Sequence, residues 1–471
     1  MPGQVFSSLF LHCKLSLPTI ISVAAFLTDA VHHKRSLSRS NKKVLHIDKN
    51  DYYGGSEAAL SLQEFQKWVD NVTQGKTSRG VSYAAQTNFT SIDGQRSPFR
   101  HASITHDAGQ SSGGKGPGLS FPRAYSLSLA PNLLYTRSAI LPVLVSSRVH
   151  HQLEFQAVGS WFVLESGPQS HAAVEGSSGT DAARSTLVRV PNSREDIFAD
   201  TSLNLRAKGA LVRFLRFVAT HEEQTEILEP YRHEPFSEFL SRHFKIPATL
   251  HGPLLALTMS SSAPEKTSTD FALPRIANHL RSMGLFGPGF SAVLPKWGGL
   301  SEIVQVACRA SAVGGAVYVL GKGIETVEET SIPDASIMER KGLRVCLAGG
   351  ETVTTSFLVG TNDQLPANST PTQVRSQDSV TVSRSISIVS SPLSALFPAI
   401  AEGSTTPAGA VVMVPSASLR GAETTNVSSL PPVQILVHSS DTGECPSGQC
   451  KSCFLPTTSI SFTRQKMIQL Y

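Results

Sequence analysis

Residues 42–60, KKVLHIDKNDYYGGSEAAL, decide the fold of this chain. The apolar run VLHI is followed at once by an acid, Asp48, and then by two tyrosines and two glycines. This order is typical of a buried strand that leaves a sheet into a tight loop. In a dinucleotide-binding fold the second strand ends in such an acid, which accepts hydrogen bonds from a ribose hydroxyl. The glycines allow a sharp turn, so we expect Tyr52 and Tyr53 to point outward.

Two blocks of the sequence resemble a known family. KKVLHIDKNDYYGGSEAALSLQEF, from residue 42, is similar to the first block of the Rab escort protein and GDP-dissociation-inhibitor superfamily, most of all to its fungal escort branch. LPKWGGLSEIVQVACRASAVGGAVYVLGKG, from residue 294, resembles the third block of that superfamily. The resemblance implies an α/β (α+β) fold with a flavoprotein-like FAD/NAD(P)-binding sheet domain and a smaller helical domain.

Composition limits the class of protein. With 471 residues and 40% hydrophobic positions, the chain is long enough to bury a sizeable core and to form two domains. The net charge of +5 contains no long basic run, so nothing in it points to nucleic acid. Six widely scattered cysteines favour a reducing compartment, and we expect a cytoplasmic protein that associates with membranes only transiently.

The N-terminal region departs from the family pattern. SLPTIISVAAFL, within residues 1–35, is too short to span a membrane, although a secretory signal peptide is an alternative that four Asn-x-Ser/Thr sequons also allow. No G-x-G-x-x-G precedes residue 42. We therefore expect the first strand and its glycine turn to be missing, which removes the phosphate-binding helix start and argues against a bound cofactor.

Composition and periodicity divide the chain into six segments. The expected segments are an atypical N-terminus at 1–35, a first part of the sheet domain at 36–163 with an insertion at 73–120, a polar insertion at 164–199, a helical domain at 200–290, a second part of the sheet domain at 291–450 and an atypical tail at 451–471.

The helical domain is a candidate for lipid binding. The resemblance implies that this domain receives a geranylgeranyl chain and, in escort proteins, docks the prenyltransferase. A lipid chain needs an apolar slot between helices, and Phe236, Phe239, Phe244 and Met283 are the residues we expect to line it or to contact the transferase. The alternative for these side chains is an ordinary helix-bundle core.

The resemblance also implies a surface that grips a GTPase. Matched by position, Tyr53, Glu302, Arg309 and Val319 are the expected Rab-binding residues. Glu302 and Arg309 are seven residues apart and so lie on similar faces of one helix, where they could equally form a plain solvated face. A tyrosine, with an apolar body and a polar tip, suits an interface.

Two further motifs match catalytic or metal patterns only formally. GQSSG at 109–113 has the G-x-S-x-G form of a hydrolase nucleophile elbow, but neither a strand pattern nor a helix pattern flanks it. Cys445, Cys450 and Cys453 provide three soft ligands without an evident fourth, which is a weak zinc signal. We expect neither a catalytic centre nor a metal.

Three functions remain in competition. The resemblance favours an accessory protein, component A of Rab geranylgeranyltransferase, which binds GDP-loaded Rab GTPases, presents them to the alpha/beta heterodimer and then delivers the lipidated product to membrane. The first alternative is a Rab GDP-dissociation inhibitor, and transferase binding would distinguish the two. The second alternative is an FAD-dependent oxidoreductase of the same fold, which the missing glycine fingerprint disfavours.

Overall fold

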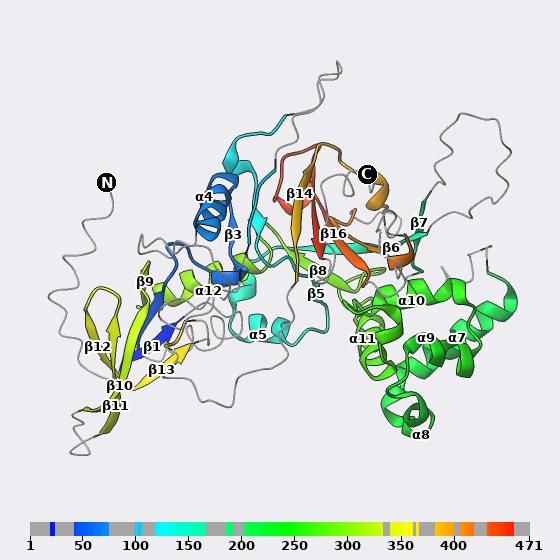
Figure 1. The fold of residues 1–471 in the computed structure, drawn as a ribbon, viewed down its shortest axis with the longest axis horizontal. Helices are drawn as coiled ribbons and strands as arrows, with labels where there is room; N and C mark the ends of the chain where they lie inside the picture. Colours follow the sequence, from blue (N-terminus) through cyan, green and yellow to red (C-terminus); the bar gives the residue numbers. More distant parts are fainter. Residues whose placement is uncertain are drawn as a thin grey trace.

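Two sheet regions and a separate group of helices make up the molecule (Figure 1). The structure is a computed structural model, and it describes residues 19–23, 42–74, 99, 101–105, 118–165, 185–191, 201, 203–332, 340–360, 364–366, 382–399, 406–418 and 431–455. The GQSSG motif at 109–113 and most of the two predicted insertions lie outside the described residues. Among the helices that are described, none is long and apolar enough to cross a membrane.

A four-stranded parallel sheet contains the apolar run VLHI that ends at Asp48. Its strands are, in order, β13 (Phe357–Gly360), β1 (Thr19–Val23), β2 (Lys43–Asp48) and β9 (Val317–Leu320). The expectation that the first strand is missing is therefore wrong. The apolar run TIISV forms it, because it pairs in register with β2 on one side and with β13 on the other. The sequence still has no glycine between β1 and Gly54.

An antiparallel hairpin layer packs against this sheet. It consists of β10 (Ile324–Ile332), β11 (Arg340–Leu347) and β12 (Thr352–Thr355). Leu45 and Ile47 of β2 form one buried cluster with Ile324, Val345 and Leu347 of the hairpin. The sequence AGGE at 348–351, whose two glycines predict a turn, joins β11 to β12, with Cys346 opposite Thr352.

The second large sheet is mixed and holds the C-terminal strands. Its order is β14 (Ser385–Val389), β17 (Cys450–Leu455), β16 (Val433–Ser439), β15 (Gly409–Val414), β6 (Phe155–Glu165), β8 (Ala292–Pro295) and β5 (Leu134–Tyr135), with β7 (Thr186–Arg189) paired to β6. β17 extends past residue 450, so the segment predicted as an atypical tail begins inside the sheet.

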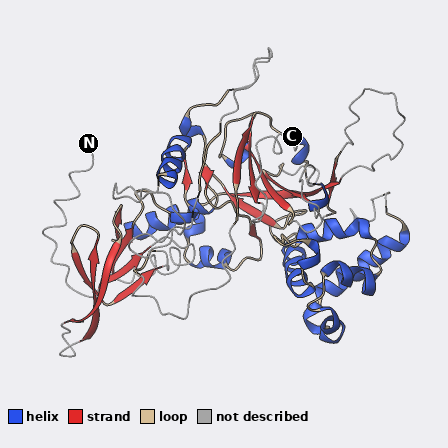
Figure 2. Cartoon of the chain, in the orientation of Figure 1, coloured by secondary structure: helices blue, strands red, loops and turns tan. Residues whose placement is uncertain are grey.

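One group of helices, within residues 205–282, lies together at one side of the molecule, as Figure 2 shows. They are α7 (Leu205–Ala219), η6 (His221–Glu223), α8 (Thr225–Leu228), η7 (Glu229–Tyr231), α9 (Phe236–Phe239), η8 (Leu240–Phe244), α10 (His251–Leu257) and α11 (Thr269–Ser282). Helical spacing of apolar residues in α7 buries one face, including Phe214 and Phe217. One buried cluster joins this core to Trp161 of β6 and Leu436 of β16.

Further helices and a short strand pair lie outside these groups. They include α4 (Leu62–Thr73), α5 (Ile140–Ser146), α12 (Leu300–Val313) and the two-stranded sheet of β3 (Ala59–Leu60) and β4 (Leu127–Ser128). α4 begins with a capping box between Ser61 and Glu64, which satisfies its first backbone N–H groups. Two conformational demands shape the loop before α12: Trp297 has a φ of 68° and Gly299, its N-cap, a φ of 60°.

Candidate functional site

α12 is the element on which the candidate site is built. Its inner face buries Ile303, Val306 and Ala307 against Leu144 and Val149, as the spacing of these apolar residues predicts. On the other side of the helix Arg309 and Ala312 are exposed, and Glu302 and Gln305 are partly exposed. The side chains that this face presents are therefore set by the packing of the inner one.

Glu302 and Arg309 meet on that exposed face. An Arg309 nitrogen donates to Glu302 Oε1 over 2.9 Å, so the two side chains form an ion pair across two helical turns. Arg309 is 56% exposed and Glu302 is 21% exposed, which leaves most of the guanidinium open to solvent. The structure thus brings together the two charged residues that the sequence placed on similar faces.

Tyr53 points inward, contrary to the outward orientation expected. Its ring lies 5.4 Å from the His46 ring of β2 and 5.8 Å from the Tyr318 ring of β9, measured between centroids. Burial, and then the neighbouring Tyr318 and Cys308, raise the pKa of Tyr53 well above its ordinary value. Because Cys308 precedes Arg309 on α12, Tyr53 connects the glycine loop to the underside of the helix rather than to solvent.

The pleat of β9 separates Val319 from the other predicted residues. Neighbouring side chains on a strand alternate between faces. Tyr318 lies beside His46 and Tyr53, whereas Val319 packs against the cluster formed by β2 and the hairpin. Tyr53, Glu302 and Arg309 thus converge on α12, while Val319 faces the hairpin layer. Its role in binding stays a prediction.

Two exposed apolar side chains stand at the two ends of α12, and motif matching missed both. Trp297, just before the helix, is 44% exposed, and Val313, its last residue, is 90% exposed. The Lys296 ammonium lies 4.8 Å from the Trp297 ring centre, a cation–π contact. The sequence offers one signal for Trp297, a large aromatic residue directly before two glycines.

Asp48 does not fit a nucleotide site. It is fully buried, and its Oδ1 accepts hydrogen bonds from the backbone N of Asn50 at 3.0 Å, from Asn50 Nδ2 at 2.8 Å and from Gln364 Nε2 at 3.4 Å. The acid that would hold a ribose hydroxyl is thus used to close its own loop. Together with the absent glycine turn, this disagrees with a dinucleotide cofactor.

The aromatic residues predicted to line a lipid slot lie in a filled core. Phe236 and Phe239 are fully buried, Phe244 is 6% exposed, and the Phe239 and Phe244 rings meet edge to face at 5.3 Å. Met283 follows α11 and is partly buried. The slot itself stays a prediction, and two cavities found among the described residues are not lined by any of these four side chains.

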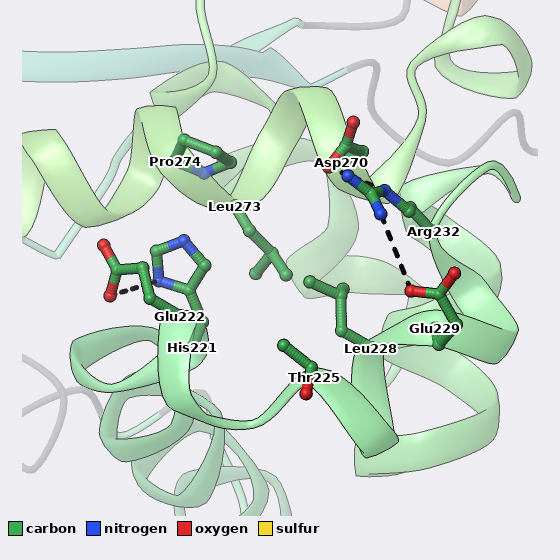
Figure 3. Close-up of a pocket in the computed structure, with 9 residues that line it drawn as sticks. All are labelled: His221, Glu222, Thr225, Leu228, Glu229, Arg232, Asp270, Leu273 and Pro274. Carbon is green, nitrogen blue, oxygen red and sulfur yellow. Dashed lines mark ion pairs between the residues drawn. The ribbon is translucent and has the colours of Figure 1, made fainter.

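A pocket of about 290 Å³ opens elsewhere in the helical domain (Figure 3). It is lined by His221, Glu222, Thr225, Leu228, Glu229, Arg232, Asp270, Leu273 and Pro274. Leu228 and Leu273 lie at its centre, and charged side chains surround them. Arg232 pairs with Glu229 at 3.6 Å and with Asp270 at 3.4 Å, so the rim is charged while the floor is apolar.

The three C-terminal cysteines do not converge. Cys450 packs into the cluster on one face of the mixed sheet, and Cys453 packs into the cluster on the other. Burial raises the pKa of Cys445 to about 12 and that of Cys450 and Cys453 to about 11, which disfavours the thiolate that a zinc ion requires. Across the described residues no group of three or more His, Cys, Asp or Glu side chains could hold a metal ion.

The fold and the site define the class of protein. A flavoprotein-like sheet arrangement is joined to a helical domain, the acid at the end of β2 is occupied by its own loop, and α12 presents an exposed arginine. The profile described as GDP dissociation inhibitor matches residues 21–90 and 108–397, which is more than half of the chain. The chain belongs to the GDP dissociation inhibitor family.

Several relatives share this similarity. The chain is 30% identical to "Rab proteins geranylgeranyltransferase component A" of Saccharomyces cerevisiae over 301 residues, covering 63% of this chain and 42% of that protein. It is 28% identical to the protein of the same name in Candida albicans over 296 residues, covering 63% and 40%. It is 25% identical to "Rab escort protein 1" of Arabidopsis thaliana over 345 residues, covering 68% and 56%. The chain thus spans about two fifths of the length of the two yeast relatives.

Solved structures agree on the fold. The crystal structure of a Rab GDI from Plasmodium falciparum superposes with a TM-score of 0.56 at 17% identity, covering 97% of this chain and 86% of that one. An oxidoreductase from Methanosarcina mazei superposes with a TM-score of 0.50 at 10% identity, covering 96% and 81%. Identities this low show a shared fold and not a shared activity.

Proposed function

We propose that this protein is an escort protein: it binds a GDP-loaded Rab GTPase on α12 and presents it to Rab geranylgeranyltransferase. The observation that carries the proposal is the Glu302–Arg309 pair on the exposed face of α12, between the exposed Trp297 and Val313. Protein interfaces are enriched in arginine and aromatic anchors. We infer the transferase as the second partner from the names of the yeast relatives, which call them component A of Rab geranylgeranyltransferase.

The mechanism is scaffolding, without chemistry by this chain. Binding both a Rab and the transferase raises the local concentration of a flexible Rab tail beside the enzyme. Transfer of the geranylgeranyl chain then occurs in the transferase. The escort protein afterwards holds the lipidated Rab and releases it during a transient contact with membrane. A dissociation inhibitor would share the Rab surface but not the transferase contact.

Arg309→Glu is expected to raise the Kd for a GDP-loaded Rab at least about tenfold, because it reverses the charge that α12 presents and places it beside Glu302. Stability should change by less than about 1 kcal/mol, since the Arg309 side chain is 56% exposed. Titration calorimetry with an unprenylated Rab measures the effect. Arg206→Glu, an exposed change of equal charge on α7, is the matched control.

Exchanging the two charges tests whether Glu302 and Arg309 contact the Rab or only stabilise α12. Glu302→Arg combined with Arg309→Glu restores an ion pair within α12 but presents it in reverse. We expect binding to remain weak. If the swapped variant binds as tightly as the original protein, the pair only stabilises its own helix and the platform lies elsewhere.

We assign docking of the transferase to the pocket in Figure 3 rather than to the phenylalanine core. An apolar floor with a charged rim suits one apolar anchor of a protein partner, desolvated at the centre and surrounded by polar contacts. The Phe236 and Phe239 side chains are fully buried and cannot be reached without opening the core. A lipid chain could enter between these phenylalanines only if the core opened, so we propose lipid binding at this position less strongly than transferase docking at the pocket.

Thr225→Trp is expected to weaken transferase binding at least about tenfold, because the indole fills the pocket from an exposed position. Glu226→Trp is the matched control: it is the next residue of α8, equally exposed, and does not line the pocket. Affinity is measured by surface plasmon resonance with the Rab-loaded protein. Equal loss in both variants, or in neither, would remove the pocket from the docking surface. Rab affinity should stay constant throughout.

The oxidoreductase alternative has a direct test. It requires a flavin, whereas the carboxylate of Asp48 is occupied by Asn50 and Gln364. We expect the purified protein to show no flavin absorbance and none after incubation with FAD.

A further inference from the structure

Three charged or titratable side chains lie together in the interior near the C-terminal strands. His438, Glu444 and Lys451 are exposed by 4%, 1% and 0%. Glu444 Oε2 accepts from Lys451 Nζ at 2.7 Å and also contacts His438 Nδ1 at hydrogen-bonding distance. Buried charges are expensive unless they are paired, and Glu444 supplies that pairing for Lys451.

Strand register creates the cluster. β16 and β17 run antiparallel, with His438 directly opposite Lys451. Residues 440–449 connect β16 to β17, and this connection places the Glu444 carboxylate between the side chains of His438 and Lys451. We call residues 440–449 the wedge. Among the described residues no other carboxylate pairs with these two bases.

Electrostatics hold Glu444 ionised despite its burial. Desolvation alone would raise the pKa of this carboxyl, but the positive charge of Lys451 and the contact with His438 outweigh it and lower the pKa to about 2. Burial alone would likewise lower the pKa of Lys451, and the Glu444 carboxylate raises it instead. Glu444 is therefore locked in place as a carboxylate at neutral pH.

The wedge is also hydrogen-bonded to Tyr125 and Ser126, the two residues before β4. Ser126 N donates to the Glu444 carbonyl at 3.0 Å, and Lys451 Nζ donates to the Ser126 carbonyl at 3.4 Å. The Tyr125 hydroxyl donates to Gln449 Oε1 at 2.9 Å. Segments more than 300 residues apart in the sequence are thereby held together.

Trp297 rests directly on the wedge. Its backbone N donates to the Thr442 carbonyl at 2.7 Å. Gly443, with a φ of 73°, passes so close beneath the indole that a Cβ on it would lie 2.5 Å from Trp297 Cδ1. Trp297 itself has a left-handed φ of 68°, a conformation that a non-glycine residue keeps only when its surroundings impose it.

We propose that the buried His438–Glu444–Lys451 cluster fixes the wedge, and that the wedge positions Trp297 and the first turn of α12. The cluster acts on the platform through this chain of contacts and does not itself touch a partner. The platform part of this inference rests on the proposed Rab binding. The positioning of Trp297 does not.

Two glycines of the wedge provide a matched test. Gly443 and Gly448 both have positive φ, 73° and 82°, so alanine strains the backbone similarly at either site. Only at Gly443 does the new methyl group collide with Trp297, because nothing lies within 4 Å of a Cβ at Gly448. The full chain, labelled with 5-fluorotryptophan, gives three fluorine resonances for its three tryptophans, and Trp297→Phe assigns the relevant one.

Gly443→Ala is expected to shift the Trp297 resonance, to speed amide hydrogen exchange at residues 297–302 and to raise the Kd for a GDP-loaded Rab about tenfold. Gly448→Ala should do none of these. An unmoved resonance in Gly443→Ala, or the same shift in both variants, overturns the positioning of Trp297. A shifted resonance with unchanged Rab affinity overturns the link to the platform.

Failure of the proposed function remains distinguishable. If the unaltered protein binds no Rab, the Rab surface is wrong, while the fluorine and exchange readouts still decide whether the wedge positions Trp297. Glu444→Gln completes the series, since it should move the Trp297 resonance in the same direction as Gly443→Ala. An unmoved resonance in a folded Glu444→Gln protein would show that the cluster does not fix the wedge.

Discussion

Glu444→Gln is expected to lower the free energy of unfolding by about 3–5 kcal/mol, because it leaves the Lys451 ammonium fully buried without a counter-charge. Glutamine has nearly the same volume, so lost packing contributes little. Urea unfolding at pH 7, followed by circular dichroism, measures the change. A loss below about 1 kcal/mol would contradict the buried charge pair.

A double variant is the control for this prediction. Glu444→Gln combined with Lys451→Met removes both charges and should recover most of the loss, because replacing a buried ion pair with uncharged side chains of similar size is often nearly neutral. The recovery distinguishes an unpaired charge from damage to the wedge. Without recovery, the shape of the loop and not its charge would determine stability.

Acid offers an independent check on the same pair. The pKa of Glu444 is lowered from its usual 4.5 to about 2, so its contribution is complete above pH 4.5 and disappears as the pH falls toward 2. Glutamine mimics the protonated acid. The difference in stability between the unaltered protein and Glu444→Gln should therefore shrink steadily from pH 5 to pH 3. A constant difference would mean that Glu444 is not ionised in the folded protein.

Phe239→Ala is expected to cost about 3–5 kcal/mol of unfolding free energy, because it leaves a cavity at the centre of the helical domain. Phe239 is fully buried, and its ring contacts the rings of Phe217 at 5.6 Å, Tyr231 at 5.2 Å and Phe244 at 5.3 Å between centroids. Thermal and urea unfolding both report the loss.

Met283→Ala is the comparison variant, and its cost should stay near 1 kcal/mol because this side chain is only partly buried. The pair decides between a filled core and a lipid slot. A slot residue would change affinity for a geranylgeranylated peptide while leaving stability intact. A stable Phe239→Ala protein with weakened lipid binding would restore the slot and remove our preference for a packed core.

Local patterns were reliable where one face of an element decides its structure. The apolar period of α12 predicted its buried face, and the spacing of Glu302 and Arg309 placed them on similar faces, because a helix puts residues seven apart on nearly the same line. The structure adds that the two side chains pair. The β11–β12 turn followed from AGGE for the same local reason.

Errors arose where the outcome depends on partners distant in the sequence. TIISV alone is too short to be distinguished from any apolar run, and only pairing with β2 and β13 makes it a strand. Tyr53 was expected outside because a glycine loop lies at a surface, yet His46 and Tyr318 offered it an aromatic site beneath α12. No sequence signal indicates which way such a ring turns.

By itself the sequence determined the two-part architecture, the strand that ends at Asp48, the helical domain and the charged face of α12, since all of these follow from hydrophobic period and turn residues. Only the tertiary structure showed that the Asp48 carboxylate is hydrogen-bonded within its own loop, that Phe236 and Phe239 fill a core, and that Lys451 is buried. The physical reason is common to all three. Burial and pairing are properties of what surrounds a side chain, and those surroundings come from segments hundreds of residues away.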